Sequence, residues 1–378
     1  MQTISVDVLV CGGGMSGMAC AAFAAESGAK VLVVEKQAVV GGSSNYSAGM
    51  LYVSRRRQVQ RILLTTSSWA PKNYNSLRSW VPDGDPELQA AWMKDYLPAK
   101  TIYIRADNET GIGFPIKIPQ LHLHHQQRIH DNNIGSQIFT NTAVVKLLQE
   151  QPGVPGSRIV GAIIRRGPGD GAGAVYYEVK AQHAVLATGG FQGNTGLTSM
   201  HLGQGGDNIF VRSNRGSVGD GLTLATAVGA GTSRGMNTYY GYLLAAPLRS
   251  EAVDPKNFLS LAQYRIPTIV RAPGYDPCLA KVLTLDRITF TYGGVLINAE
   301  GRALTPDKTP IPGLLIAGVD GGGFSNLGYA GGLALAFVTG LWAARTIATE
   351  LKLPVPQLPA ADLRDAGPHE DPVIASRL

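Results

Sequence analysis

The chain contains little cysteine and no long apolar run. Three of its 378 residues are cysteines, at positions 11, 20 and 278. Three cysteines cannot build the disulfide framework of a small secreted protein, so Cys11 and Cys20 are expected in a reduced core. No apolar run approaches the ~20 residues that a membrane span needs. Asp7 interrupts the apolar N-terminal stretch, which argues against a signal peptide there. The sequence therefore predicts no membrane span and no disulfides.

Charged side chains are also scarce, at 16% of the residues, and the net charge is +6. Much of the basic excess lies in one short segment that contains Arg55, Arg56, Arg57 and Arg61. A nucleic-acid-binding surface spreads its basic residues over one face among aromatic neighbours. The local run predicts a solvated loop instead, and no nucleic-acid partner.

Histidine is the one metal-ligating residue that clusters. Four of the seven histidines lie in residues 121–130. No cysteine or carboxylate cluster accompanies them, and their spacing matches no zinc-binding pattern. The sequence therefore predicts no metal site.

Glycine, in contrast, is abundant, with 47 residues against a usual share of about 7%. Its first concentration belongs to a unit that reads strand, glycine turn, helix, strand. An apolar run predicts the first strand, an alanine-rich stretch the helix, and a run of valine and leucine the second strand. These elements are expected at Val6–Val10, Gly17–Glu26 and Val31–Val34.

The turn carries Gly-x-Gly-x-x-Gly at Gly12, Gly14 and Gly17. Gly12 permits the tight turn, Gly14 lets a pyrophosphate approach the backbone, and Gly17 lets the helix pack close to the strand. The helix N-terminus offers free N–H groups and a positive dipole end to phosphates. Glu35, which ends the second strand, can accept hydrogen bonds from a ribose diol. The unit therefore predicts dinucleotide binding.

The later part of the chain alternates predicted strands with glycine-rich loops. Strands are predicted at Gln137–Thr140, Val144–Leu148, Ile159–Arg165, Val175–Val179, Thr289–Ile297 and Pro312–Ala317, with a further buried strand from His183 to a small-residue turn at 187–190. Helices are predicted within Pro82–Pro98 and at Leu222–Val228 and Gly332–Glu350. Asp85 is the expected cap of the first helix, and Asp220 can cap the second or orient a polar cofactor group.

Four later segments follow the N-terminal motif in a familiar order: HAVLATGGFQGN, GDGLTLATAVGA, ITFTYGGVLI and IPGLLIAGV…NLGYAGGLALAFVTG. Together they resemble the flavoprotein family of fumarate reductase and the succinate dehydrogenase flavoprotein subunit. The likeness is greatest to the branch with 3-ketosteroid Δ1-dehydrogenases and tricarballylate dehydrogenase-like enzymes. It covers most of residues 5–349, with gaps.

The resemblance implies an α/β fold with a Rossmann-like FAD-binding domain and an inserted, shortened α+β cap domain. The FAD-binding domain would comprise residues 1–211 and 289–351, the cap residues 212–288, and a flexible tail residues 352–378. The basic segment Tyr52–Ser68 interrupts the likeness, as a loop insertion or as retained intron sequence.

The resemblance also implies non-covalent FAD, since the histidine that bears covalent flavin in the family has no counterpart in residues 41–45. Glu35 would meet the adenosine ribose and the backbone of Val144 the adenine. Gly332–Ala334, at a helix N-terminus, would face the flavin edge where negative charge develops on reduction. The implied cofactor-binding residues are Gly12, Gly14, Met15, Ser16, Gly17, Glu35, Lys36, Gly42, Ser43, Ser44, Ala48, Gly49, Met50, Val144, Ala187, Thr188, Gly189, Gly190, Asp220, Gly318, Asp320, Gly332, Leu333 and Ala334.

Departures from the family concern the substrate. Phe290 and Tyr329 stand where fumarate reductases carry a histidine and a substrate-binding arginine, so fumarate and succinate are not the expected substrates. By analogy with the steroid dehydrogenases, Tyr329 would polarise a substrate carbonyl, and Tyr292, Tyr240 or Tyr239 would be the base. A tyrosine with a pKa near ~10 is a poor base at neutral pH, so the site would have to lower it. The alternative is that these tyrosines only wall an apolar pocket.

Val319 replaces the acidic residue that contacts the ribityl chain in many relatives, and Asp320 is the candidate substitute. The expected activity is FAD-dependent oxidation or reduction of a CH–CH bond beside a carbonyl or similar group, in a mainly apolar small molecule, with an unknown electron donor or acceptor. The alternatives are an FAD-dependent isomerase or cyclase and a defective flavoprotein remnant. The terminal Ser376-Arg377-Leu378 resembles a peroxisomal address, so a cytoplasmic or peroxisomal location is expected.

Overall fold

The computed structural model describes part of the chain: residues 1–47, 85, 87–88, 90–92, 94–95, 118–132, 134–167, 173–203, 205–241, 244–245, 284–285, 287–324 and 332–357. Several predictions concern residues outside this part, namely Ala48, Gly49, Met50, the segment 52–68, Cys278, Tyr329 and the tail beyond residue 357.

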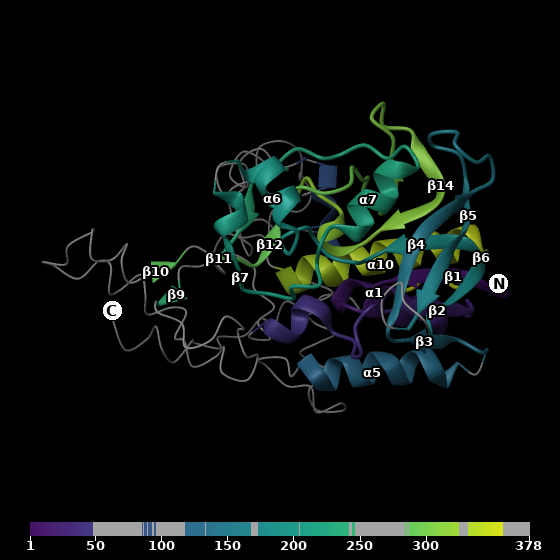
Figure 1. Cartoon of the computed structure of the whole chain (residues 1–378). Helices are drawn as coiled ribbons and strands as arrows, with labels where there is room; N and C mark the ends of the chain where they lie inside the picture. The colour runs from purple at the N-terminus through teal and green to yellow at the C-terminus, as the bar shows by residue number, and fades with distance from the viewer. Residues whose placement is uncertain are drawn as a thin grey trace, which may run out of the picture.

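The largest sheet of the described residues has eight strands, and its labelled strands lie toward the right of the view in Figure 1. Its parallel part runs β14, β6, β1, β2, β3 in space, and β13 pairs antiparallel with β14 at one edge. The bounds are β1 Gln2–Cys11, β2 Val31–Val34, β3 Gln137–Phe139, β6 Val175–Leu186, β13 Arg302–Leu304 and β14 Pro310–Ile316. All of β2 and the last four residues of β1 and of β6 are buried, because helices or other strands cover both faces there, as is typical of a parallel α/β sheet.

The antiparallel strands β4 (Thr142–Gln149) and β5 (Ile159–Arg166) extend this sheet, since β5 pairs with the first half of β6. The remaining elements are short. They are η1 Gly42–Tyr46, α6 Thr195–Leu202, η3 Gly206–Asn208, β7 Phe210–Val211, α7 Asp220–Ala227, β8 Tyr239–Tyr240, β9 Leu244–Ala245, β10 Thr284–Leu285, β11 Arg287–Ile288, β12 Phe290–Thr291 and η5 Gly318–Asp320. Three two-stranded pairings join segments far apart in the chain: β7 pairs with β11, β8 with β12, and β9 with β10, the last pair lying wholly within the predicted cap. The domain division itself stays a prediction.

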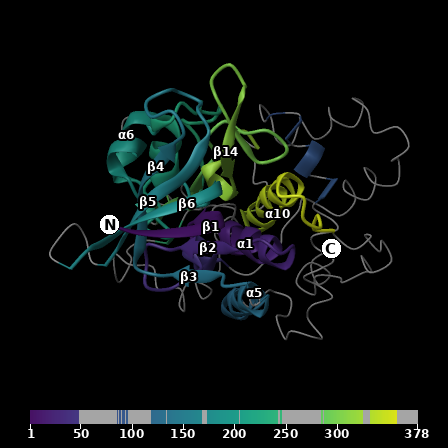
Figure 2. The ribbon, with the colours of Figure 1, turned by 90° about the vertical axis from the view of Figure 1, so that its right-hand side faces the viewer.

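Helices α1 (Met15–Glu26) and α10 (Gly332–Glu350) lie side by side against the sheet (Figure 2). Small residues permit their close approach, because a Cβ on Gly340 would lie 2.4 Å from the backbone oxygen of Ser16. The rings of Phe23 and Phe337 meet edge to face at 5.6 Å. Within the described residues, α10 is the one helix long and apolar enough to cross a membrane, and 78% of that stretch is buried inside the protein. It packs here as a core helix.

Helix α5 (Ile118–Asp131) packs against the outer side of α1 (Figure 2). The Arg128 guanidinium donates to both carboxylate oxygens of Glu26, at 2.5 and 2.6 Å, and lies 4.6 Å from the centre of the Phe23 ring. Sequence patterns did not predict this helix, because its histidines and glutamines blur the apolar period.

The main sequence predictions for the fold are confirmed. The α/β class, the strand–turn–helix–strand unit, the final helix and the burial of Cys11 and Cys20 all hold. The side chain of Asp85 accepts hydrogen bonds from the backbone N–H groups of Glu87 at 2.9 Å and Leu88 at 3.2 Å, as a helix cap does.

Two strand predictions are wrong in length. The separate strands expected at 175–179 and from His183 form the single strand β6, because its first half pairs with β5 and its second half with β14. The strand expected at Thr289–Ile297 is reduced to β12. A Cβ on Gly294 would lie 2.3 Å from the backbone oxygen of Asp320, so the backbone leaves the strand path here to pass another segment closely.

Candidate functional site

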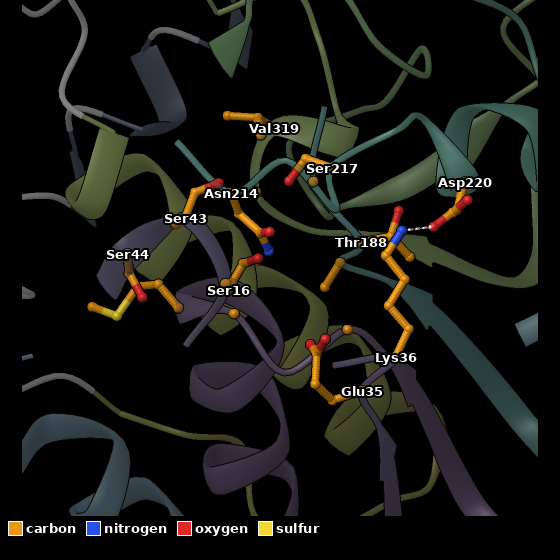
Figure 3. A pocket seen from close by; sticks show the side chains of 18 of the residues that line it. Ser16, Glu35, Lys36, Ser43, Ser44, Thr188, Asn214, Ser217, Asp220 and Val319 are labelled. Carbon is orange, nitrogen blue, oxygen red and sulfur yellow. Dashed lines mark hydrogen bonds and ion pairs between the residues drawn. The ribbon is translucent and has the colours of Figure 1, made fainter. Parts of the chain in front are cut away.

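A cavity of about 630 Å³ opens at the carboxyl ends of β1, β2 and β6 (Figure 3). This edge is where ligands bind in open parallel sheets, because the loops there diverge and the helix N-termini point toward it. Residues from both ends of the chain meet in the lining, from the glycine turn after β1 to the first turn of α10.

Each glycine of the turn has surroundings that fit its place in the motif. Gly12 has φ +111°, and a Cβ there would lie 2.2 Å from the backbone oxygen of Ala187. A Cβ on Gly17 would lie 1.9 Å from the backbone oxygen of Gly12, so only glycine lets α1 approach the turn this closely. Gly14 differs, since the nearest atom to its Cβ position is the Gly41 oxygen at 4.0 Å. Gly14 lines the cavity, so its bare backbone leaves room for a ligand.

Gly14 also occupies the N-cap position of α1, and no side chain caps the helix. Met15 and Ser16, in the first turn, line the cavity. The N-terminal end of α1 therefore presents its dipole and uncapped N–H groups to the cavity, where a phosphate can bind.

Glu35 lies beside this turn with 6% of its surface exposed. Its carboxylate accepts hydrogen bonds from the backbone N–H groups of Gly13, at 2.7 Å, and Gln37, at 2.8 Å. Glu35 still lines the cavity. The two backbone donors fix the carboxylate in position, and its remaining lone pairs can accept from a ribose diol.

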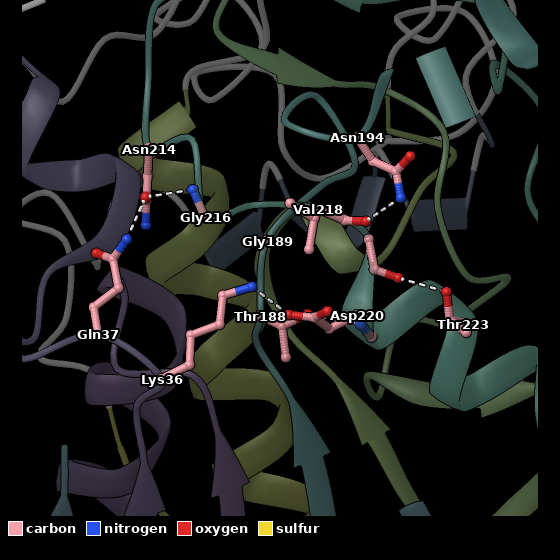
Figure 4. Close-up of polar contacts among 12 residues, drawn as sticks. Lys36, Gln37, Thr188, Gly189, Asn194, Asn214, Gly216, Val218, Asp220 and Thr223 are labelled. Carbon is pink, nitrogen blue, oxygen red and sulfur yellow. Dashed lines mark hydrogen bonds and ion pairs between the residues drawn. The ribbon is translucent and has the colours of Figure 1, made fainter. Parts of the chain in front are cut away.

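Lys36 and Asp220 form an ion pair in the cavity wall (Figure 4). The pair connects the end of β2 to the start of α7. Asp220 was one candidate for the N-cap of this helix, and that interpretation is wrong. The cap position is Gly219, whose φ of +83° suits a glycine, and the Asp220 carboxylate binds Lys36 instead.

Asp320 is 2% exposed and does not itself line the cavity. It accepts hydrogen bonds from the Thr188 hydroxyl and from the Gly189 backbone N–H, both at 3.0 Å. Burial raises the pKa of Asp320 to about 7, against the opposing effect of these donors. Thr188 and Val319 line the cavity, so Asp320 acts on the cavity through Thr188 and Gly189.

A second wall of the cavity, away from the glycine turn, combines aromatic and polar groups. The rings of Tyr240 and Phe290 lie 5.2 Å apart, on the paired strands β8 and β12. Arg212 is 4% exposed and donates from Nη1 to the Thr289 hydroxyl at 2.9 Å. A Cβ on Gly332 would lie 3.2 Å from the Phe290 ring, so this wall adjoins the N-terminus of α10. All five residues line the cavity.

Most of the predicted cofactor residues come together here. Those that line the cavity are Gly12, Gly14, Met15, Ser16, Glu35, Lys36, Gly42, Ser43, Ser44, Val144, Ala187, Thr188, Gly189, Asp220, Gly318, Gly332 and Leu333, with Tyr240 among the predicted tyrosines. The predicted residues that are described but do not line it are Gly17, Gly190, Asp320, Ala334, Tyr239 and Tyr292. Gly17 and Gly190 pack against other parts of the chain instead of the cavity. A Cβ on Gly17 would lie 1.9 Å from the backbone oxygen of Gly12, and a Cβ on Gly190 would lie 2.3 Å from the Thr291 hydroxyl.

The polar lining residues that sequence reasoning missed include Arg212, Asn214, Ser217 and Thr289. The Asn214 side-chain oxygen accepts from Gln37 Nε2 and from the Gly216 backbone N–H, each at 2.8 Å (Figure 4). Asn214 and Ser217 precede the Gly-Asp-Gly that drew attention in the sequence, and this proximity was the available signal. No sequence signal marked Arg212.

The histidine-rich segment belongs to α5. Among the described residues, no group of three or more His, Cys, Asp or Glu side chains is placed to hold a metal ion. His122 and His125 are buried at 3% and 1% exposure.

Comparison with known proteins agrees with this geometry. Residues 7–87 match the family described as FAD binding domain. The chain is 29% identical over 241 residues to a fumarate reductase (cytochrome) of Shewanella frigidimarina, which covers 60% of this chain and 40% of that protein. It is 27% identical over 253 residues to a vinyl phenol reductase of Lactiplantibacillus plantarum, covering 63% of this chain and 49% of that one.

Among solved structures, 3-ketosteroid-delta4-(5alpha)-dehydrogenase from Rhodococcus jostii, in complex with 4-androstene-3,17-dione, superimposes with a TM-score of 0.62. The identity is 17%, and the match covers 92% of this chain and 98% of that one, so it shows a shared fold. The chain spans less than half the length of the curated relatives above. The family match lies on the glycine turn and Glu35, which supports FAD as the dinucleotide.

Proposed function

We propose that this chain, a relative of the fumarate reductase and succinate dehydrogenase flavoproteins, is an FAD-dependent oxidoreductase acting on a carbon–carbon bond beside a carbonyl or similar group. One observation carries the proposal. A single cavity holds the dinucleotide-binding turn at one end and a wall of aromatic and polar side chains at the other. A cofactor and a small substrate can therefore meet in it.

The cofactor end fits FAD on three features of the described residues. Gly14 leaves open space where a side chain would stand, α1 presents an uncapped N-terminus, and Glu35 is held in place as an acceptor. When bound, FAD supplies the hydride acceptor or donor of the reaction. Gly332 and Leu333, at the N-terminus of α10, would stabilise negative charge that develops on the flavin.

The substrate end supports a mainly apolar molecule with one polar oxygen. Phe290 and Tyr240 offer ring surface, and Arg212 and Thr289 offer polar groups in the same wall. Two of the similar proteins are named for compounds of this kind, a vinyl phenol and a ketosteroid. Phe290 stands where the fumarate reductases carry a histidine, so we do not propose a dicarboxylate such as fumarate.

Tyr240 is our preferred proton donor or acceptor among the three candidate tyrosines that the structure describes, because it lines the cavity and Tyr239 and Tyr292 do not. Its place on β8, paired with β12, keeps its ring beside Phe290. Tyr329 keeps its proposed part as the group that polarises the carbonyl; this part rests on the family likeness.

The proposal is tested with purified full-length chain. We expect yellow protein that releases FAD on denaturation, and a lasting loss of the flavin's visible absorbance when an active ketosteroid, enone or vinyl phenol is added without oxygen. If the enzyme instead reduces its substrate, protein whose FAD has first been reduced should regain its yellow colour when that substrate is added without oxygen. Conversion of a substrate without any lasting change in flavin colour would favour the isomerase or cyclase. Protein that takes up no FAD would refute the proposal.

A matched pair of variants tests the assignment of Tyr240. Tyr240→Phe should lower kcat by roughly 10²- to 10⁴-fold, the range for loss of a general acid or base, with FAD still bound. Tyr176→Phe is the control, since Tyr176 is 39% exposed on β6 and outside the cavity lining. Full activity of Tyr240→Phe would move the proton transfer to another residue.

A further inference from the structure

The histidine-rich helix α5 contacts the short helix η1, which lines the cofactor cavity. His122 lies on its buried face, 3% exposed, and its Nε2 is 2.8 Å from the hydroxyl of Ser44. Ser44 belongs to η1, is 7% exposed and lines the cavity (Figure 3). The two residues are 78 positions apart in the chain. His122 itself does not line the cavity, so any effect on a ligand passes through Ser44.

The direction of this hydrogen bond follows from the other partner of Ser44. The Ser44 hydroxyl lies 2.5 Å from the backbone oxygen of Gly41. A carbonyl oxygen only accepts, so the hydrogen between the two oxygens belongs to Ser44. That hydroxyl has no second hydrogen for His122, and the remaining bond must be donated by His122 Nε2–H.

The imidazole is neutral in this setting. Burial lowers the pKa of His122 to about 4, so near neutral pH the ring carries one N–H, and the bond to Ser44 places it on Nε2. The other ring nitrogen, Nδ1, has no hydrogen-bond partner among the described residues. A buried polar atom without a partner costs free energy, which an apolar side chain at this position would avoid. Stability of α5 therefore gives no reason for a histidine here, whereas the bond to Ser44 does.

We propose that His122 is a positioning residue of the cofactor site: by donating to Ser44 it fixes that hydroxyl as a hydrogen-bond acceptor facing the cavity. The inference rests on the proposed FAD site and goes beyond it by adding a residue outside the lining. An acceptor in this loop suits a donor group of the cofactor, such as a ribityl hydroxyl or the N3–H of the flavin ring. The loop is held in a special conformation, with Gly41 at φ +122° and Gly42 at φ +48°, so Ser44 has little freedom to find another partner.

The test compares FAD affinity across a small set of variants of the full-length protein. FAD is removed from each purified protein, and its dissociation constant is measured by titration calorimetry on adding FAD back. The set contains Ser44→Ala, His122→Leu, His122→Gln and the double variant Ser44→Ala/His122→Leu. Glutamine can place an amide N–H near the position of Nε2, so it restores the donor. His125→Leu is the control, because His125 is also buried in α5 but contacts Arg128 instead of the loop.

Loss of one hydrogen bond predicts a rise in the FAD dissociation constant of about 3- to 10-fold for Ser44→Ala and for His122→Leu. His122→Gln and His125→Leu should stay within about 2-fold of the unmodified chain. The double variant should bind FAD no more weakly than Ser44→Ala, because His122 acts only through Ser44. Circular dichroism of the bound flavin should change in the same variants.

Wild-type affinity in His122→Leu would overturn the proposal, as would a double variant whose losses add. Equal losses in His122→Gln and His122→Leu would also overturn it, since the donor would then be irrelevant. If His122→Leu fails to fold, wild-type affinity in Ser44→Ala still refutes the idea. An unmodified chain that binds no FAD would refute the proposed function as well, whereas the other outcomes leave that function intact.

Discussion

Replacing Glu35 by glutamine is the most direct test of how the cofactor turn is held. The Glu35 carboxylate is 6% exposed and accepts backbone hydrogen bonds from Gly13 at 2.7 Å and Gln37 at 2.8 Å. Glutamine keeps one acceptor oxygen for one of these two backbone N–H groups, but its NH₂ group, which only donates, must face the other. One buried donor then loses its acceptor, which costs about 1–3 kcal/mol. The free energy of unfolding of the FAD-free protein should fall by that amount.

The same substitution acts on FAD binding through a second route. If Glu35 accepts from the ribose, Glu35→Gln removes a charge-assisted hydrogen bond worth about 1.5–3 kcal/mol. The FAD dissociation constant should then rise roughly 10- to 150-fold. The two effects are separable, because unfolding is measured without FAD and affinity by titration.

Urea unfolding followed by far-ultraviolet circular dichroism gives the first quantity, and calorimetric titration with FAD the second. Glu26→Gln is the matched control: Glu26 lies on α1, its side chain is 43% exposed, and its pair with Arg128 is worth less than about 1 kcal/mol. Glu35→Gln with wild-type stability would refute the account of the two backbone hydrogen bonds. Lower stability with wild-type FAD affinity would place the ribose elsewhere.

Three further predictions follow from the described contacts. Gly14→Ala should leave the FAD-free protein as stable as before in urea unfolding, yet weaken FAD binding at least 10-fold in a titration, because the new Cβ enters only the cavity. Gly17→Ala should fold poorly, since its Cβ would lie 1.9 Å from a backbone oxygen. His122 has a pKa of about 4 when folded and about 6.5 when unfolded, so the unfolded chain binds more protons between these values. Stability should fall by about 3 kcal/mol as pH drops from 6.5 to 4, and His122→Gln should remove this part of the slope in urea titrations. Lys36→Gln should change the unfolding free energy by less than about 1 kcal/mol, because the side chains of Lys36 and Asp220 are 29% and 37% exposed; a larger loss would show that the pair holds α7 in place.

The cofactor half of the site could be predicted because its signals are local. The turn glycines, the start of α1 and Glu35 lie within 24 residues, from position 12 to position 35, and each has a steric or hydrogen-bonding requirement that one residue type meets. The structure shows those requirements directly, in the space at Gly14 and the close contact at Gly17. The ends of α10 were equally clear, because a mostly apolar helical stretch follows a glycine pair and ends at Glu350.

The proposed substrate half was harder to predict, since its residues carry no motif of their own. Arg212 looks like any other arginine in the sequence, and only the folded chain buries it beside Thr289 and Phe290. The strand expected through residues 289–297 also failed, because the close passage of another backbone at Gly294 overrides the local preference for a strand.

The amino-acid sequence by itself therefore determined the α/β class, the dinucleotide turn and its acidic partner, because adjacent residues enforce them through backbone geometry. The tertiary structure alone decided which distant side chains meet. Asp220 pairs with Lys36 across 184 positions, Asp320 supports Thr188 across 132, and His122 reaches Ser44 across 78. Such contacts depend on how helices and loops pack around the sheet, and packing depends on the shapes of many residues at once, which no local pattern records.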